Sequence, residues 1–335
     1  MLIWLDWFCR YTSDLLPEKL RHGDPRTNLA MWTADWLQAA KRGKIAKINL
    51  LEETFYVLLA LFTTPYLPAG STVLFEDQPP ANPLGLVLTR ATAGLLADAN
   101  LPNSVDAQWS QTFGDNRAIY VDVPHGALLV ELAPGDVVEL RAIFAGTLRN
   151  ATPFAETFMT FVGLLTDRGS ERGRGRFLGT IAPDGRVRAM ASTSSPRLTM
   201  ADSDLKAPFV DPGAETRARE RTGQFLRLVL AYYAFGPEEA REKLKTTETG
   251  RLIQGKPRKG ENFFAMTRLN PAHDRLGRPA TTELSSWSLT SRQDVTGHFK
   301  LQPHGPAMSL RKLIWVEGYI RGPVEAPVRP RAYHV

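Results

Sequence analysis

The feature of this 335-residue chain that most constrains its fold is a series of short apolar runs in its middle third, separated by glycine and proline turns. Turns such as Pro134-Gly135-Asp136, placed between runs of about four to eight residues, are typical of antiparallel strands joined by hairpins. The spacing therefore predicts a mostly antiparallel β-meander. Its expected strands are Ala118–Val123, Leu128–Leu132, Val137–Ala145 and Thr157–Thr166, followed by a hairpin of Arg176–Ile181 and Arg186–Met190.

Helical patterns flank this central region. Residues 1–98 contain apolar stripes at helical spacing, interrupted by a short strand at Ser71–Glu76, and end with a helical stretch at Leu84–Ala97. A strong helix is expected at Ala214–Phe235, and its C-terminal half is apolar on nearly all sides, which indicates burial. A polar helix at Glu238–Lys245 should follow. The expected fold class is α+β, with N-terminal helices, a central mostly antiparallel β-meander, a long buried helix and a C-terminal β-hairpin.

The same patterns divide the chain into parts. Residues 1–98 form the helical part, and residues 99–190 form the antiparallel β-rich part. A Ser/Pro-rich segment at 191–212 resembles a linker. Residues 213–335 contain the long helix and the C-terminal strands. These parts are also compatible with one continuous globular unit.

Composition limits the environment and the partners. The single cysteine, Cys9, excludes an intrachain disulfide and a cysteine-based zinc site, which fits a reducing compartment. No stretch approaches the ~20 uncharged apolar residues that cross a membrane. We therefore expect a cytoplasmic protein without a membrane partner. The net charge of +6 mildly favours polyanions.

Motifs for catalysis are missing from the sequence. It has no phosphate-binding Gly-rich loop, no dinucleotide-binding fingerprint, no His-Glu-x-x-His and no nucleophile elbow. Cys9 lies in an apolar helical pattern rather than in the electropositive setting of a reactive thiolate. The expectation is a binding protein with no catalytic residues, no metal and no cofactor.

One alternative is a metal-dependent hydrolase or nuclease. Among the six histidines, only His298 and His304 are close in sequence, and Asp294 or Glu317 would have to complete the site. Metal sites usually need at least three converging ligands. The other interpretation is that both histidines are hydrogen-bonded structural groups.

An Arg/Gly segment at 167–177 is the first candidate for contact with RNA. It places Arg172 and Arg174 among glycines at the tip of a predicted hairpin. A guanidinium can bind two phosphate oxygens at once, and a flexible backbone lets it do so. The alternative is a solvated loop.

The C-terminal segment 297–322 is the second candidate site. Two strand-like runs, Val295–Gln302 and Lys312–Ile320, are joined by a Pro/Gly turn. The aromatic rings of the second run, Trp315 among them, are bordered by basic side chains. Rings in such a setting can hold an RNA base or an extended peptide. The other interpretation is a terminal hairpin that closes the core and buries its tryptophan. The predicted partner-binding residues are His298, Lys300, Arg311, Lys312, Trp315 and Arg321.

Two motifs carry a resemblance to a known family. Gly297-His298-Phe299, the glycine turn at Gly305 and the strand ending in Trp315-Val316 resemble the C-terminal signature of the large anti-CRISPR proteins directed at type V-A systems. The strand Tyr120-Val121-Asp122 is similar to an aromatic-Val-Asp strand of that family. The resemblance covers the middle sheet and the C-terminal third. Thr296 departs from it where a basic residue is frequent, and Phe299 stands where tryptophan is common.

The resemblance implies a non-enzymatic regulator encoded on a mobile element. In that family, the studied activity is recognition of the nascent N-terminal peptide of the nuclease during translation, followed by loss of its mRNA. The partners implied here are a nascent protein chain, its mRNA, or both, with the ribosome nearby. A further interpretation is a structural protein of a mobile element.

Overall fold

The fold is described from a computed structural model of the chain. It describes residues 81–101, 117–147, 159–169, 173–182, 186–188, 212–247, 263–271, 291–295, 297–306 and 309–329, together with Met31, Ala34 and Asp35. The predicted N-terminal helices, the strand at 71–76 and the linker-like segment up to residue 211 lie outside the described residues, apart from those three positions. No helix in the described ranges is long and apolar enough to span a membrane.

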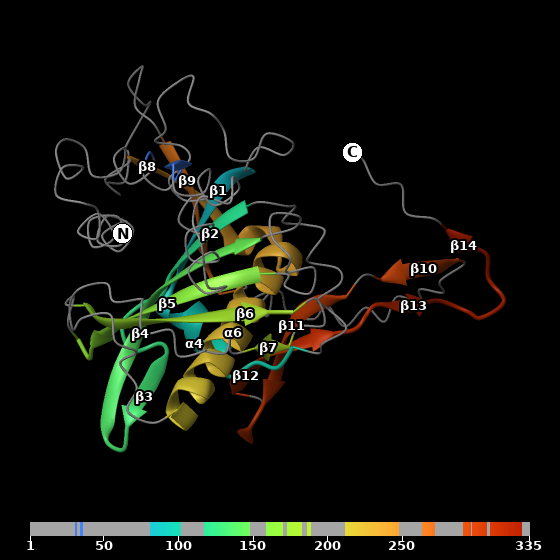
Figure 1. Cartoon of the computed structure of the whole chain (residues 1–335). Coiled ribbons are helices and arrows are strands. Elements are labelled where there is room, and N and C mark those ends of the chain that lie inside the picture. Colours follow the sequence, from blue (N-terminus) through green and yellow to red (C-terminus); the bar gives the residue numbers. More distant parts are fainter. Residues whose placement is uncertain are drawn as a thin grey trace.

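A nine-stranded sheet forms the centre of the molecule (Figure 1). The strand order is β7-β6-β5-β4-β2-β1-β9-β8, and β3 pairs with β4 beside this path. The predicted meander is confirmed, because β4 pairs antiparallel with β2, β3 and β5, and β6 pairs antiparallel with β5 and β7. The strands are β1 Ala81–Leu88, β2 Arg117–Asp122, β3 Leu129–Ala133, β4 Asp136–Thr147, β5 Met159–Asp167, β6 Gly173–Ile181, β7 Val187–Arg188, β8 Arg241–Thr247 and β9 Phe263–Leu269.

The sheet is not antiparallel throughout. Strand β1 pairs parallel with both β2 and β9. Beyond β9, the edge strand β8 pairs antiparallel with β9. The helix predicted for 84–97 is therefore wrong in its first part, because residues 84–88 belong to β1. A strand that is buried on both faces reads as a continuous apolar run, and such a run has no period that separates it from a buried helix.

The helix α4, Arg90–Ala97, begins directly after β1. Thr89 is its N-cap, and the Thr89 hydroxyl accepts a hydrogen bond from the backbone N–H of Thr92 at 3.2 Å. The Thr92 hydroxyl donates to the carbonyl oxygen of Leu269 at 2.9 Å. The cap therefore fixes α4 to the end of β9 as well as starting the helix.

The long helix α6, Pro212–Phe235, packs against β3, β6, β7 and α4. Its predicted position and its buried C-terminal half are confirmed, since the stretch from Phe225 to Tyr232 is buried. After it, the predicted polar helix at 238–245 is wrong. A short 3-10 turn, Glu238–Ala240, leads into the edge strand β8. Charged side chains are common on edge strands, and in the sequence they resemble the polar face of a helix.

The C-terminal strands form two small sheets. Strands β11, His298–His304, and β12, Leu310–Val316, make an antiparallel hairpin. Strands β10, Arg292–Val295, β13, Tyr319–Arg321, and β14, Val328–Arg329, make a three-stranded sheet that projects away from the body (Figure 1). We call this second sheet the arm. Each of the two predicted runs is thus divided between the hairpin and the arm.

Candidate functional site

The hairpin β11–β12 carries most of the predicted partner-binding residues. Its register pairs His298 with Val316 and Lys300 with Ile314. Lys312 lies two residues from Ile314 along β12, on the same face. Residues that pair directly, and every second residue along a strand, share a face. His298, Lys300 and Lys312 therefore lie on one face, which we call the outer face. Both lysines are exposed.

The opposite, inner face packs on the core. Phe299 pairs with Trp315, and both contact the hydrophobic core, as does the buried Leu313. By alternation, the half-buried Arg311 belongs to this inner face. The structure therefore does not bring Arg311 and Trp315 together with the two lysines on a single surface.

Trp315 lies in a chain of aromatic rings. Its ring centroid is 5.1 Å from that of Phe299 and 5.5 Å from that of Phe235, with interplanar angles of 76° and 68°. Phe299 in turn contacts Tyr232 at 5.7 Å. These edge-to-face contacts fix the hairpin to the end of α6. Trp315 is thus part of the core boundary rather than a platform for an RNA base.

The indole and its glycine neighbour are closely fitted. A Cβ atom added to Gly297 would lie 2.4 Å from Cζ2 of Trp315, so only glycine leaves room for the ring. The indole nitrogen of Trp315 is buried and has no hydrogen-bond partner within the described ranges.

The hairpin geometry opposes a metal site on its two histidines. His298 and His304 are the first and last residues of β11, and six residues of extended strand span about 20 Å. One ion cannot bind both imidazoles at that separation. Asp294 lies on the arm, and no group of three metal-ligating side chains occurs among the residues that the structure describes.

The other predicted site residues lie elsewhere. Arg321 is exposed on β13 of the arm. Arg172 lies outside the described residues, and Arg174 is described only as part of the backbone of β6. Arg168, which precedes them at the β5–β6 tip, is exposed.

The hairpin also has an unpaired edge. In the described part of the chain, β12 pairs with β11 on one side and with no strand on the other. Strand β11 contains Pro303, which has no N–H, whereas β12 contains no proline. An edge strand with unpaired N–H and C=O groups can accept an added strand. Strand β12 is therefore the better template.

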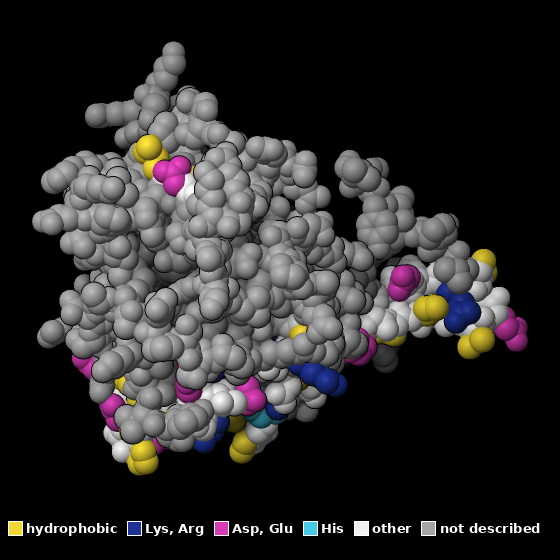
Figure 2. Space-filling view, viewed as in Figure 1, with side chains coloured by type: hydrophobic (Ala, Val, Ile, Leu, Met, Phe, Trp, Pro, Cys, Tyr) yellow, Lys and Arg dark blue, Asp and Glu magenta, His cyan; other side chains and the backbone are white. Residues whose placement is uncertain are grey.

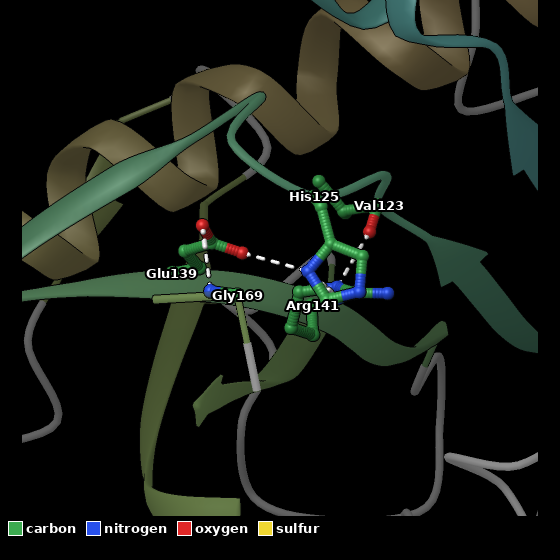
Figure 3. A network of polar contacts seen from close by, with 5 residues as sticks. All are labelled: Val123, His125, Glu139, Arg141 and Gly169. Atoms are coloured by element: carbon green, nitrogen blue, oxygen red, sulfur yellow. Dashed lines mark hydrogen bonds and ion pairs between the residues drawn. The ribbon is translucent and has the colours of Figure 1, made fainter. Parts of the chain in front are cut away.

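A second, polar cluster lies where β2 ends and β4 runs beside it (Figure 3). Glu139 is 3% exposed, and its Oε2 is 3.0 Å from Nδ1 of His125, a side chain that is 46% exposed. The other carboxylate oxygen accepts the N–H of Gly169 at 3.3 Å. The buried Arg141 donates from Nε to the carbonyl oxygen of Val123 at 3.1 Å, and its guanidinium contacts the ring nitrogens of His125.

The titration of Glu139 reflects this network. Burial alone would raise the pKa of Glu139, but hydrogen bonds from His125 and from the N–H groups of Gly126 and Gly169, with the charge of His125, lower it overall. The carboxylate therefore stays charged. It ties the turn that carries His125 to the Arg-bearing β5–β6 tip.

Two acidic groups on β2 behave differently. Burial raises the pKa of Asp122 to about 6, against the opposing charges of Arg141 and His125. Burial also raises the pKa of Tyr120, and the charge of Asp122 adds to this shift. The carboxyl groups of Asp122 and Glu139, both influenced by His125, thus have pKa values shifted in opposite directions.

This cluster was not predicted from the sequence. Its members come from β2, β4 and two turns, and only the strand register brings them together. One signal was available: Glu139 interrupts an apolar strand pattern, and a carboxylate at such a position needs buried partners.

Comparisons with protein-family models, with curated proteins and with solved structures find no match to this chain.

Proposed function

We propose that this chain is a non-enzymatic regulatory protein of the cytoplasm that binds an extended, nascent polypeptide along the free edge of β12. The edge of β12 that no described strand occupies is the observation that carries the proposal. A polypeptide that leaves the ribosome is unfolded and can supply a strand. Main-chain hydrogen bonds then give affinity, and side-chain contacts give specificity.

The hairpin is held in place for this role. The contacts of Phe299 and Trp315 with α6 hold its inner face. A template that is already ordered loses little conformational freedom on binding. The edge therefore does not have to form at the moment of contact.

The outer face indicates the chemistry of the partner. Lys312, Ile314 and Val316 alternate along this face of β12, beside Lys300. A strand added next to them places every second side chain on that face. We expect acidic side chains opposite the lysines and an apolar side chain opposite Ile314 or Val316.

The resemblance of this segment to the anti-CRISPR family extends the proposal to loss of the target mRNA. Capture of the nascent chain would bring the protein to the translating complex, and the exposed Arg168 with Arg172 and Arg174 would contact the RNA. Such contact with phosphates would weaken with added salt.

The test is affinity capture from translating cells, with sequencing of the RNA and identification of the nascent chains in the same sample. The variant Lys300→Glu/Lys312→Glu should lose the captured chains. The matched control Lys243→Glu changes an exposed lysine on β8, at the far edge of the large sheet, and should retain them. Equal capture by both variants would exclude the outer face as the binding surface.

Release of nascent chains with puromycin separates the two partners. If the polypeptide is the primary contact, puromycin should remove the captured RNA together with the chains. RNA that stays bound after puromycin would instead show that RNA is held without the polypeptide, and the nascent chain would then not be the primary contact.

A further inference from the structure

The arm exposes apolar side chains on a sheet of only three short strands. On or next to β13, Tyr319 is 46% exposed and Ile320 is 53% exposed, and Val324 is 81% exposed. Figure 2 shows hydrophobic, basic and acidic side chains side by side on this projecting part of the molecule. Isolated small sheets without a buried face have marginal stability. The arm is therefore expected to gain stability from a covering partner.

One edge of the arm is open. Strand β13 pairs with β10, Val295 opposite Tyr319 and Gln293 opposite Arg321, and no other described strand pairs with β13. The outermost strand thus presents backbone groups together with the exposed Arg321, and the exposed Glu317 lies two residues before the strand begins.

The charge order along β13 and the two residues that precede it is self-complementary. The sequence reads Glu317-Gly318-Tyr319-Ile320-Arg321, with an acid two residues before the tyrosine and a base two residues after it. In an antiparallel pair related by a two-fold axis at Tyr319, Glu317 of each copy lies opposite Arg321 of the other. At each end of the pairing an acidic side chain then lies opposite a basic one, and such opposed charges stabilise a strand pair.

The apolar residues fit the same register. Ile320 of each copy would lie opposite Gly318 of the other, so a large side chain meets a position without a Cβ atom. The two Tyr319 side chains would meet at the axis. If the two-fold axis lay at Ile320 instead of Tyr319, Glu317 would lie opposite Pro323, and both ion pairs would be lost.

We infer that β13 pairs antiparallel with β13 of a second copy of this chain, about a two-fold axis at Tyr319. The two arms would then form one six-stranded sheet. Such an isologous contact uses the same surface on both copies and closes on itself, so it yields a dimer and no fibre. The inference does not depend on the proposed function, because it concerns a different strand and a different partner.

Sedimentation of the full chain over a concentration series tests the dimer. The natural chain should approach twice its monomer mass. Glu317→Arg alone and Arg321→Glu alone should each remain monomeric, because each places like charges opposite each other at both ends. An equimolar mixture of these two variants should form a dimer, since every opposed pair is then complementary. A monomeric natural chain, or a mixture that stays monomeric, would overturn the inference.

Cross-linking tests the register independently of charge. In a Cys9→Ser background, Tyr319→Cys should form a disulfide between copies, because directly opposed residues have Cα atoms about 4.5–5.5 Å apart. Val324→Cys is more exposed and lies off β13, so it is the matched control. Cross-linking of Val324→Cys as fast as that of Tyr319→Cys would contradict the two-fold axis. This readout holds even if a charge variant is poorly folded.

Discussion

The rings of Trp315 and Phe299 meet edge to face across the β11–β12 pair, with centroids 5.1 Å apart and an interplanar angle of 76°. Because Phe299 also contacts Tyr232 of α6, this pair holds the hairpin in a fixed position against the long helix. The tryptophan thus determines where the β12 edge lies without belonging to the outer face.

Removal of this ring should loosen the hairpin. For Trp315→Ala we expect a loss of about 3 kcal/mol in the free energy of unfolding, at the lower end of the range for large aromatic truncations, because Trp315 is only half-buried. Trp315→Phe should cost less, because it keeps an aromatic ring against Phe299 and Phe235. Chemical denaturation monitored by far-UV circular dichroism measures both. Equal losses for the two variants would show that the aromatic contacts are unimportant.

Gly297 should tolerate no side chain. Gly297→Ala places a Cβ 2.4 Å from Trp315, so the ring must move, at a cost of about 1–3 kcal/mol for overpacking. Gly94→Ala is the matched control, since nothing lies within 4 Å of a Cβ there. Within α4, that control should be neutral or slightly stabilising. Thermal unfolding of the two variants distinguishes these outcomes.

Glu139 should be needed for the polar cluster. Glu139→Gln leaves one acceptor oxygen for three donors, so we expect a loss of about 1–3 kcal/mol. The control Glu131→Gln changes an exposed acid that also accepts a backbone N–H, and should stay within about 0.5 kcal/mol. Since the pKa of Glu139 is lowered on folding, its stabilising effect is lost as pH falls through that pKa. The difference between wild type and Glu139→Gln should therefore shrink in acid.

Asp122 should show the opposite pH dependence. Its pKa is raised on folding to about 6, so the folded state binds the proton more tightly than the unfolded state. Stability attributable to Asp122 is present below about pH 4 and is lost as pH rises to about 6. Asp122→Asn should flatten this part of the stability curve and raise stability at neutral pH. If urea unfolding from pH 4 to 8 gave parallel curves for both proteins, the assignment would be wrong.

The sequence was informative where local pattern and tertiary environment agree. Strand β4 was predicted closely, because its apolar run begins at a turn containing Gly135, whose φ of 80° suits glycine. The long helix was also predicted well, since nothing in its sequence competes with the helical pattern.

The errors have physical causes. Strand β1 pairs with β2 on one edge and with β9 on the other, and residues 84–88 are all buried, so its apolar run gave no strand period. Strand β8 has the charges of an exposed edge, which resemble those of a polar helix. Glu317 and Gly318 separate β12 from β13, and the continuous alternation across them concealed the break.

The candidate site was predicted only in part. The hairpin and its lysines were foreseen, but the division of its residues between two faces depends on which face meets α6. The pairing of His125 with Glu139 depends on the register of β2 and β4, which no local spacing contains.

The internal position of β1 in the sheet has a consequence for the order in which the strands can pair. Its two neighbours lie on either side of it in the sheet, but β9 is synthesised long after β1 and β2, and the Thr92–Leu269 hydrogen bond spans 177 residues. Until residue 269 has emerged from the ribosome, one side of β1 stays open. We expect folding of this sheet to be slow and to finish late in synthesis, since non-local parallel pairing requires closure of a long loop. Chains that end before β9 should therefore aggregate.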